Sequence, residues 1–260
     1  NVSYAVILFS ALSYFFPAFG EGNTLAAIIG ASVVLWAVHA LLLVGVREAA
    51  ITNLVTTIAK VAPILMFIAL VAAAFSVPTF NLDFSGLSNP GLGSVMDQVK
   101  GTMLVTLWVF IGIEGASVVS RRASNRKDIG FSTLAGFLIC LVLYAAVSLI
   151  SLGIMPQAEL AALKNPSMAG VLEKVVGPWG AVLINLALVV SVLGAFLSWT
   201  LLAAEIPFEA AKDGSMPKFF ATENAKGSPS ASLWVTNLLV QAFLIVTYFA
   251  NSTYMALFSI

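Results

Sequence analysis

Long apolar runs dominate the chain, and short polar stretches interrupt them. A transmembrane helix needs about 20 consecutive, mostly apolar residues. Seven runs come close to or exceed this length, and an eighth begins near Thr253. We place the seven at about Val2–Phe19, Leu25–Val46, Ile51–Val77, Val95–Val119, Phe131–Ile154, Val182–Ala204 and Leu233–Phe249. The pattern therefore predicts an all-α integral membrane protein that crosses the bilayer several times.

Three connections between these runs differ in character. Pro78–Pro90 is rich in Pro, Gly, Asn and Ser, a composition typical of a loop. Met155–Pro178 mixes charges with Ala and Leu, which favours a short amphipathic helix at the membrane surface. Glu205–Ser228 is the longest polar stretch and is expected to join two spans.

Composition supports the membrane assignment. The chain is 60% hydrophobic and 9% charged, whereas a soluble domain has about 25% charged residues. Its surface must therefore face the lipid bilayer. The formal net charge is zero, so nothing suggests a nucleic-acid partner, which requires a basic patch. The only cysteine, Cys140, rules out a disulfide within the chain.

The loops between alternate spans differ in Lys and Arg content. One set holds Arg47, Arg121, Arg122, Arg126, Lys127, Lys212, Lys218 and Lys226, and the opposite set holds Lys100, Lys164 and Lys174. Cytoplasmic loops carry the excess of basic residues. The first set is therefore predicted to be cytoplasmic, and the first span runs outward. Both ends of the chain lie in apolar runs, and we expect a fragment of a longer protein.

Two ionisable residues lie deep inside apolar spans, where they are costly and usually functional. Glu114 stands between Gly112 and Gly115, and glycine allows a helix to open. Broken helices at the bilayer midplane form binding sites in secondary transporters. The alternative for the glycines is close helix packing, which leaves the glutamate unexplained. Lys60 lies halfway along its span, where a functional role as an internal cation or proton carrier and a structural role as a tether between helices are equal alternatives.

Aromatic residues inside the spans give a weaker signal. Trp108 and Trp199 lie away from the span ends, where interface tryptophans gather. An indole face can bind a cationic group with about 0.5–2 kcal/mol, but packing is the more frequent role. His39 is the single histidine and is expected to be hydrogen-bonded in a core. Motifs of metalloproteases, serine hydrolases, P-loop proteins and dinucleotide-binding enzymes are absent from the sequence.

Five segments resemble the amino acid–polyamine–organocation (APC) transporters. Trp108–Ser117 (WVFIGIEGAS) and the basic loop Ser120–Gly130 resemble the sixth helix of that superfamily and the loop after it. Ser198–Glu205 and Ala210–Phe220 resemble the eighth helix and its exit, and Ser13–Pro17 resembles the end of the third. The paired arginines of the basic loop are most similar to those of bacterial arginine/ornithine antiporters.

The resemblance implies a LeuT-like fold of five plus five helices in inverted repeats. The chain would span helix 3 to the start of helix 10. Residues 1–77 would complete the first repeat, and residues 95–260 would form most of the second. The first helix, whose Gly-rich break binds the carboxylate and amino groups of the substrate in this family, would precede Asn1.

The resemblance also implies roles for individual residues. Trp108 would line the route to the substrate side chain, and Ile111 and Gly112 would form the unwound, substrate-binding backbone. Trp199 would pack on an arginine-like side chain, and Asn1 would lie near the guanidinium group. Glu114 would act in coupling or hold the opened helix. Lys60 would replace a bound sodium ion, although some relatives that exchange arginine for agmatine lack this lysine.

We therefore expect a secondary transporter, not an enzyme, that exchanges arginine for ornithine in the bacterial inner membrane. Alternatives are an APC carrier of polyamines, glutamate or neutral amino acids, and, in another class, a channel or seven-helix receptor. The expected partners are an amino acid and the lipid bilayer. We expect no cofactor, metal or nucleic acid, and leave a homodimer open.

Overall fold

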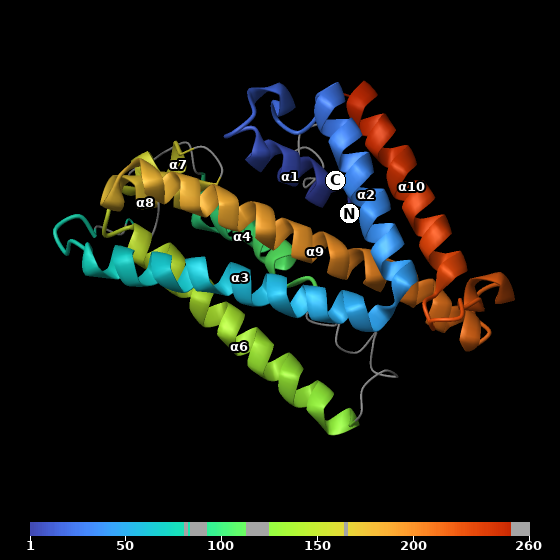
Figure 1. The fold of residues 1–260 in the computed structure, drawn as a ribbon. Helices are drawn as coiled ribbons and strands as arrows, with labels where there is room; N and C mark the ends of the chain where they lie inside the picture. The colour runs from blue at the N-terminus through green and yellow to red at the C-terminus, as the bar shows by residue number, and fades with distance from the viewer. Residues whose placement is uncertain (81–82, 84–92, 113–124, 164–165, 251–260) are drawn as a thin grey trace. The chain divides into compact units, whose positions relative to one another are not determined.

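A computed structural model describes residues 1–80, 83, 93–112, 125–163 and 166–250 (Figure 1). The chain divides into two compact units, which we call unit 1 (Asn1–Ile64 and Ala181–Ile260) and unit 2 (Leu65–Gly180). Every regular element among the described residues is helical. The all-α architecture predicted from the apolar runs is therefore confirmed for this part of the chain.

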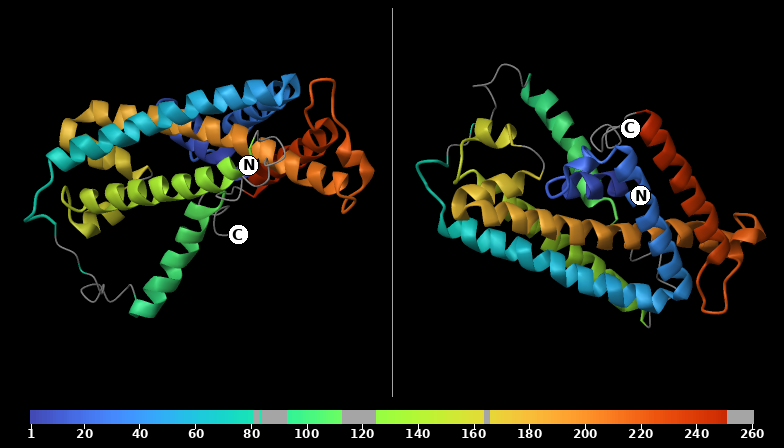
Figure 2. Two further views of the ribbon diagram at one scale, coloured as in Figure 1. Left: turned by 90° about the horizontal axis from the view of Figure 1, so that it is seen from below. Right: turned by 45° about the horizontal axis from the view of Figure 1, so that its top comes forward.

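Unit 1 is built from helices at both ends of the sequence. They are α1 (Val2–Leu12), the 3₁₀ turn η1 (Pro17–Phe19), α2 (Leu25–Val44), α3 (Val46–Ala73) as far as Ile64, α9 (Pro178–Lys212) from Ala181, the 3₁₀ turn η4 (Lys218–Ala221) and α10 (Ser230–Phe249). Figures 1 and 2 show α2 and α10 side by side. Thr24 caps α2, because its hydroxyl accepts a hydrogen bond from the backbone N–H of Ala27 at 3.2 Å.

The core of unit 1 contains both small and large side chains. Leu8, Leu35, Phe196 and Leu244 come from α1, α2, α9 and α10 and are almost fully buried. Ala5, Ala27 and Ala31 are buried in the same cluster. In lipid the hydrophobic effect gives helices little reason to associate, so close packing through small residues matters more. The alanines allow the backbones of α1 and α2 to approach, and the larger side chains fill the remaining space.

One end of unit 1 is held by the loop between α9 and α10. Ser228 Oγ donates to the carbonyl of Leu42 at 2.7 Å, and Asn224 Nδ2 donates to that of Leu43 at 2.8 Å. These bonds satisfy carbonyls in the last turn of α2, which no helical N–H can reach. The loop therefore lies beside the last turn of α2, shortly before α3 begins at Val46.

Unit 2 contains the remainder of α3, α4 (Val95–Phe110), α6 (Arg126–Ser151), α7 (Gln157–Ala161) and α8 (Ser167–Val176). Ser94 caps α4, since Asp97 N donates to its hydroxyl and the hydroxyl donates back to Asp97 Oδ2 at 2.6 Å. The single amphipathic helix expected over Met155–Pro178 is instead two short helices. An ion pair of 2.9 Å between Lys174 and Glu159 joins them.

Among the residues that the structure describes, five helices are long and apolar enough to cross a membrane: Leu25–Val44, Leu54–Ala73, Asp128–Ser151, Pro178–Lys212 and Ser230–Phe249. They correspond to five of the seven predicted spans. The first predicted span is wrong in length, because α1 ends at Leu12. Pro17 disfavours helical backbone at Phe16, which is extended (φ −131°, ψ 90°). The eighth span, expected from Thr253, lies outside the described residues.

The predicted end of the sixth span at Ala204 is also wrong. Helix α9 continues through Glu205 and Pro207 to Lys212 and has 35 residues. At about 1.5 Å per residue it is about 52 Å long, more than the roughly 30 Å of a hydrocarbon core. Glu205 is 1% exposed, so this carboxylate is packed within protein and does not mark the end of the helix.

Candidate functional site

Helices α1 and α9 meet through an aromatic and a polar contact in unit 1. The rings of Tyr4 and Trp199 stack with centroids 6.4 Å apart and an interplanar angle of 25°. One turn earlier on α1, Asn1 Nδ2 donates to Thr200 Oγ1 at 3.4 Å. Asn1 and Tyr4 are three residues apart, the spacing that places two side chains on one helix face. The two helices thus bring together an amide, a phenol, an indole and a hydroxyl, which we call the α1–α9 cluster.

Thr200 is the buried member of this cluster. It is 0% exposed, and its hydroxyl donates to the carbonyl of Phe196 at 2.7 Å. This bond to the carbonyl four residues earlier is the usual way for a threonine to be satisfied inside a helix. Because the proton is already used, the oxygen can act only as an acceptor toward Asn1.

The cluster unites two residues that the sequence singled out, Asn1 and Trp199, from opposite ends of the chain. It also contains Tyr4 and Thr200, which the sequence analysis missed. A signal was available for each: Tyr4 follows Asn1 by one helical turn, and Thr200 is a polar neighbour of Trp199 within an apolar run. What could not be inferred from one sequence is that helices almost 200 residues apart touch at this point.

The other expected substrate residues belong to unit 2. Helix α4 ends at Phe110, and Ile111 and Gly112 form a turn in which Gly112 has φ +107°. Residues with a Cβ rarely adopt this backbone conformation. The backbone of Trp108 lies in α4, but its side chain and all of Glu114 lie outside the described residues. The helix therefore stops where the sequence predicted a break, whereas the roles of these residues remain predictions.

Lys60 lies near the middle of α3, as expected, and is half-buried. Pro63 within the same helix removes a backbone N–H and so leaves a carbonyl one turn earlier without its helical partner. One turn before Lys60, α3 approaches α9 so closely that a Cβ on Gly194 would overlap the Thr56 side chain. Lys60 thus lies beside a tight α3–α9 contact, and its coupling role remains a prediction.

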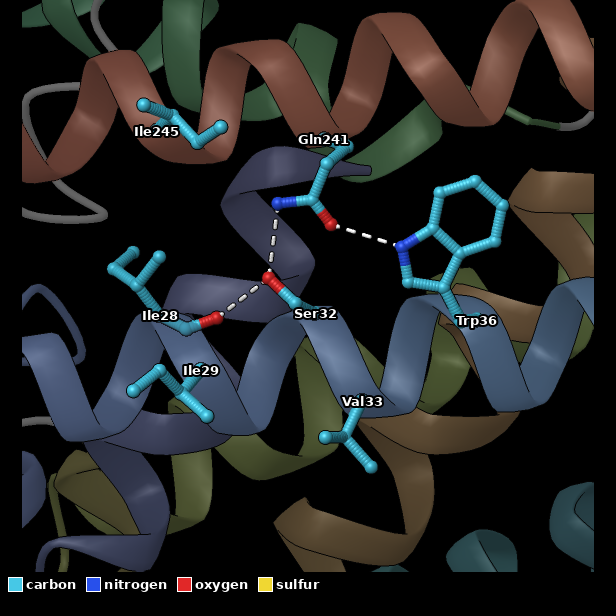
Figure 3. Close-up of a pocket in the computed structure, with 7 residues that line it drawn as sticks. All are labelled: Ile28, Ile29, Ser32, Val33, Trp36, Gln241 and Ile245. Carbon is cyan, nitrogen blue, oxygen red and sulfur yellow. Dashed lines mark hydrogen bonds between the residues drawn. The ribbon is translucent and has the colours of Figure 1, made fainter.

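A second polar cluster, the α2–α10 seam, consists of Ser32, Trp36, His39, Asn237 and Gln241. Trp36 Nε1 donates to Gln241 Oε1 at 3.1 Å, and Gln241 Nε2 donates to Ser32 Oγ at 2.9 Å (Figure 3). Asn237 Nδ2 lies 2.9 Å from His39 Nδ1, and His39 is 3% exposed. The expectation that His39 is hydrogen-bonded in a core is confirmed.

Three seam residues, Ser32, Trp36 and Gln241, line an open groove of about 520 Å³ whose other lining residues are Ile28, Ile29, Val33 and Ile245 (Figure 3). Ser32 Oγ donates to the carbonyl of Ile28 within α2 at 2.8 Å. The Trp36 N–H and both ends of the Gln241 amide make bonds between the two helices. Such a lining offers little to a polar amino acid, and we interpret the seam as a tether between α2 and α10.

The chain is similar to a known protein family and to individual bacterial proteins. The sequence profile of a family described as amino acid permease matches residues 1–260. The chain is 57% identical over 251 residues to the "Arginine/ornithine antiporter" of Pseudomonas aeruginosa, covering 96% of this chain and 52% of that protein. A protein of Escherichia coli, provisionally named an arginine/ornithine antiporter, is 51% identical over 266 residues, 100% of this chain and 57% of its own.

The "Arginine/agmatine antiporter" of Chlamydia pneumoniae is 48% identical over 265 residues, 100% of this chain and 55% of that protein. The chain thus spans about half the length of the curated relatives it matches. These relatives are bacterial, and five helices in the described part of this chain are long and apolar enough to cross a membrane. The chain is accordingly a multi-pass protein of the bacterial inner membrane.

Proposed function

Since this chain belongs to the amino acid permease family, we propose that it works as an antiporter that exchanges arginine for ornithine. The relatives named for ornithine are 51% and 57% identical to it, and the relative named for agmatine is 48% identical. This difference favours ornithine as the exchanged metabolite. Agmatine exchange is the alternative that the assay below distinguishes.

The observation that supports this proposal best is the α1–α9 cluster. A cationic side chain needs hydrogen-bond acceptors and can rest on an aromatic face. Trp199 supplies an indole face whose orientation is supported by Tyr4, and Asn1 supplies an amide one turn away. These are the groups that a guanidinium or ammonium side chain would bind within an apolar membrane protein.

Alternating access explains how such a site would support exchange. The amino-acid carboxylate and ammonium groups would bind at the turn Ile111–Gly112 that follows α4, with Trp108 lining the route. Interrupted helices form the substrate sites of many secondary transporters. Glu114 would couple occupancy to this opening, and Lys60 would take the place of a coupling cation. Exchange without sodium follows from this role of Lys60.

The proposal is tested by uptake of labelled arginine into proteoliposomes that contain the full-length protein. We expect internal ornithine to accelerate uptake strongly, with no change when external sodium is replaced by choline. Equal uptake with and without internal ornithine would contradict antiport. Faster uptake with internal agmatine than with ornithine would favour the agmatine alternative, and inhibition by glutamate or neutral amino acids alone would contradict a cationic substrate.

A further inference from the structure

We propose that Thr200 is a positioning residue that fixes the orientation of the Asn1 amide and so makes the site selective for cationic side chains. The inference rests on the proposed function, because it takes Asn1 to face the substrate. Thr200 itself is 0% exposed, accepts a hydrogen bond from Asn1 and need not touch the substrate.

The orientation follows from the number of protons on the Thr200 hydroxyl. A hydroxyl has one proton to donate and two lone pairs with which to accept. The Thr200 hydroxyl donates its proton to the carbonyl of Phe196, with 2.7 Å between the two oxygens. Only lone pairs of the Thr200 oxygen therefore face Asn1. Of the two ends of the Asn1 amide, only the Nδ2 end can donate to them, and it does so at 3.4 Å. The opposite orientation would place Oδ1 against an oxygen lone pair.

With Nδ2 turned to Thr200, the Asn1 carbonyl oxygen must point toward a different neighbour. A carbonyl oxygen accepts hydrogen bonds and carries partial negative charge. It therefore matches the N–H groups of a guanidinium or ammonium ion. A neutral urea group also has N–H donors, but its hydrogen bonds to this oxygen are weaker, because hydrogen bonds from an ionised donor are roughly twice as strong as those between neutral groups. The fixed amide thus favours arginine over its neutral isostere citrulline.

The test is a competition assay with the full-length protein in proteoliposomes. The half-inhibitory concentrations of unlabelled arginine and citrulline against labelled arginine are measured for wild type, Thr200→Val and Thr200→Ser. Valine has the shape of threonine without the hydroxyl, and serine restores the hydroxyl. Thr247→Val is the matched control, because Thr247 is 3% exposed on α10 and donates to the Phe243 carbonyl at 2.8 Å in the same way.

We expect Thr200→Val to reduce the preference for arginine over citrulline about tenfold, the effect of one misdirected hydrogen bond to a charged group. Thr200→Ser and Thr247→Val should keep the wild-type ratio. Because a loss of packing alone would weaken both ligands equally, an unchanged ratio in Thr200→Val would overturn the proposal. If that variant does not fold, Thr200→Ala gives the same readout. Failure of the proposed function would be seen separately, in the wild-type protein: unlabelled arginine would then not inhibit uptake of labelled arginine.

Discussion

Gln241 provides a quantitative test of the α2–α10 seam. Its amide joins Trp36 Nε1 at 3.1 Å and Ser32 Oγ at 2.9 Å. The substitution Gln241→Met keeps the length of the side chain and removes both bonds. Hydrogen bonds between transmembrane helices contribute about 0.6 kcal/mol on average and at most about 1.7 kcal/mol. Two lost bonds therefore give an expected loss of about 1.2 kcal/mol in the free energy of unfolding, with an upper bound of about 3.4 kcal/mol.

The assay is equilibrium unfolding of the full-length protein in mixed micelles of increasing SDS content. Leu239→Met on the same helix is the control, since Leu239 is 56% exposed and apolar. A double-mutant cycle with Ser32→Ala isolates one of the two bonds and should give a coupling of about 0.6 kcal/mol. The KM for arginine should be unchanged, because the groove beside the seam is not the substrate site.

Two results would refute this reasoning. A coupling energy indistinguishable from zero would mean that the Gln241–Ser32 bond does not hold the helices together. A change in the KM for arginine without loss of stability would mean that the groove beside the seam does bind substrate, contrary to the interpretation of the seam as a tether.

Three further predictions follow from single contacts. Trp199→Leu should raise the apparent Kd for arginine about 2- to 30-fold, the loss of a cation–π contact; unchanged binding in a calorimetric titration would exclude Trp199 from the site. Ser228→Ala should lower the free energy of unfolding by about 1–3 kcal/mol, because the Leu42 carbonyl loses a buried donor; an unchanged unfolding midpoint would count against the loop as a clamp. Glu223→Gln should change the free energy of unfolding by less than about 1 kcal/mol, since the ion pair with Lys212 is exposed. A larger loss of stability in the same assay would mean that this ion pair contributes more than exposed pairs usually do.

The sequence predicted the helices better than their ends. Run length alone located five spans, because a bilayer requires about 20 apolar residues whatever the tertiary contacts are. Hydropathy places the end of α9 before Glu205, because a charged residue is expected outside a membrane span, whereas neighbouring protein buries this residue. Tertiary packing can bury a carboxylate and supply its hydrogen-bond partners, and the hydropathy of the sequence does not reveal this.

The contacts between helices were beyond the reach of the sequence. Trp36 and Gln241 are separated by 205 positions, and nothing in one sequence pairs them. Asn1 and Trp199 were both singled out through the family resemblance, but their proximity, and the part of Tyr4 and Thr200 in the same cluster, come only from the packing of α1 on α9. The sequence can propose residues for a site, and the fold decides which of them meet.

Exchange itself is tested most directly by a dual-label experiment on the full-length protein in proteoliposomes. Vesicles are loaded with ornithine carrying one isotope, and arginine carrying another is added outside. The account predicts that arginine entry and ornithine exit proceed one for one, and that neither moves when the opposite side holds no cationic amino acid. Arginine entry into empty vesicles at the same rate, or ornithine exit without external arginine, would contradict it.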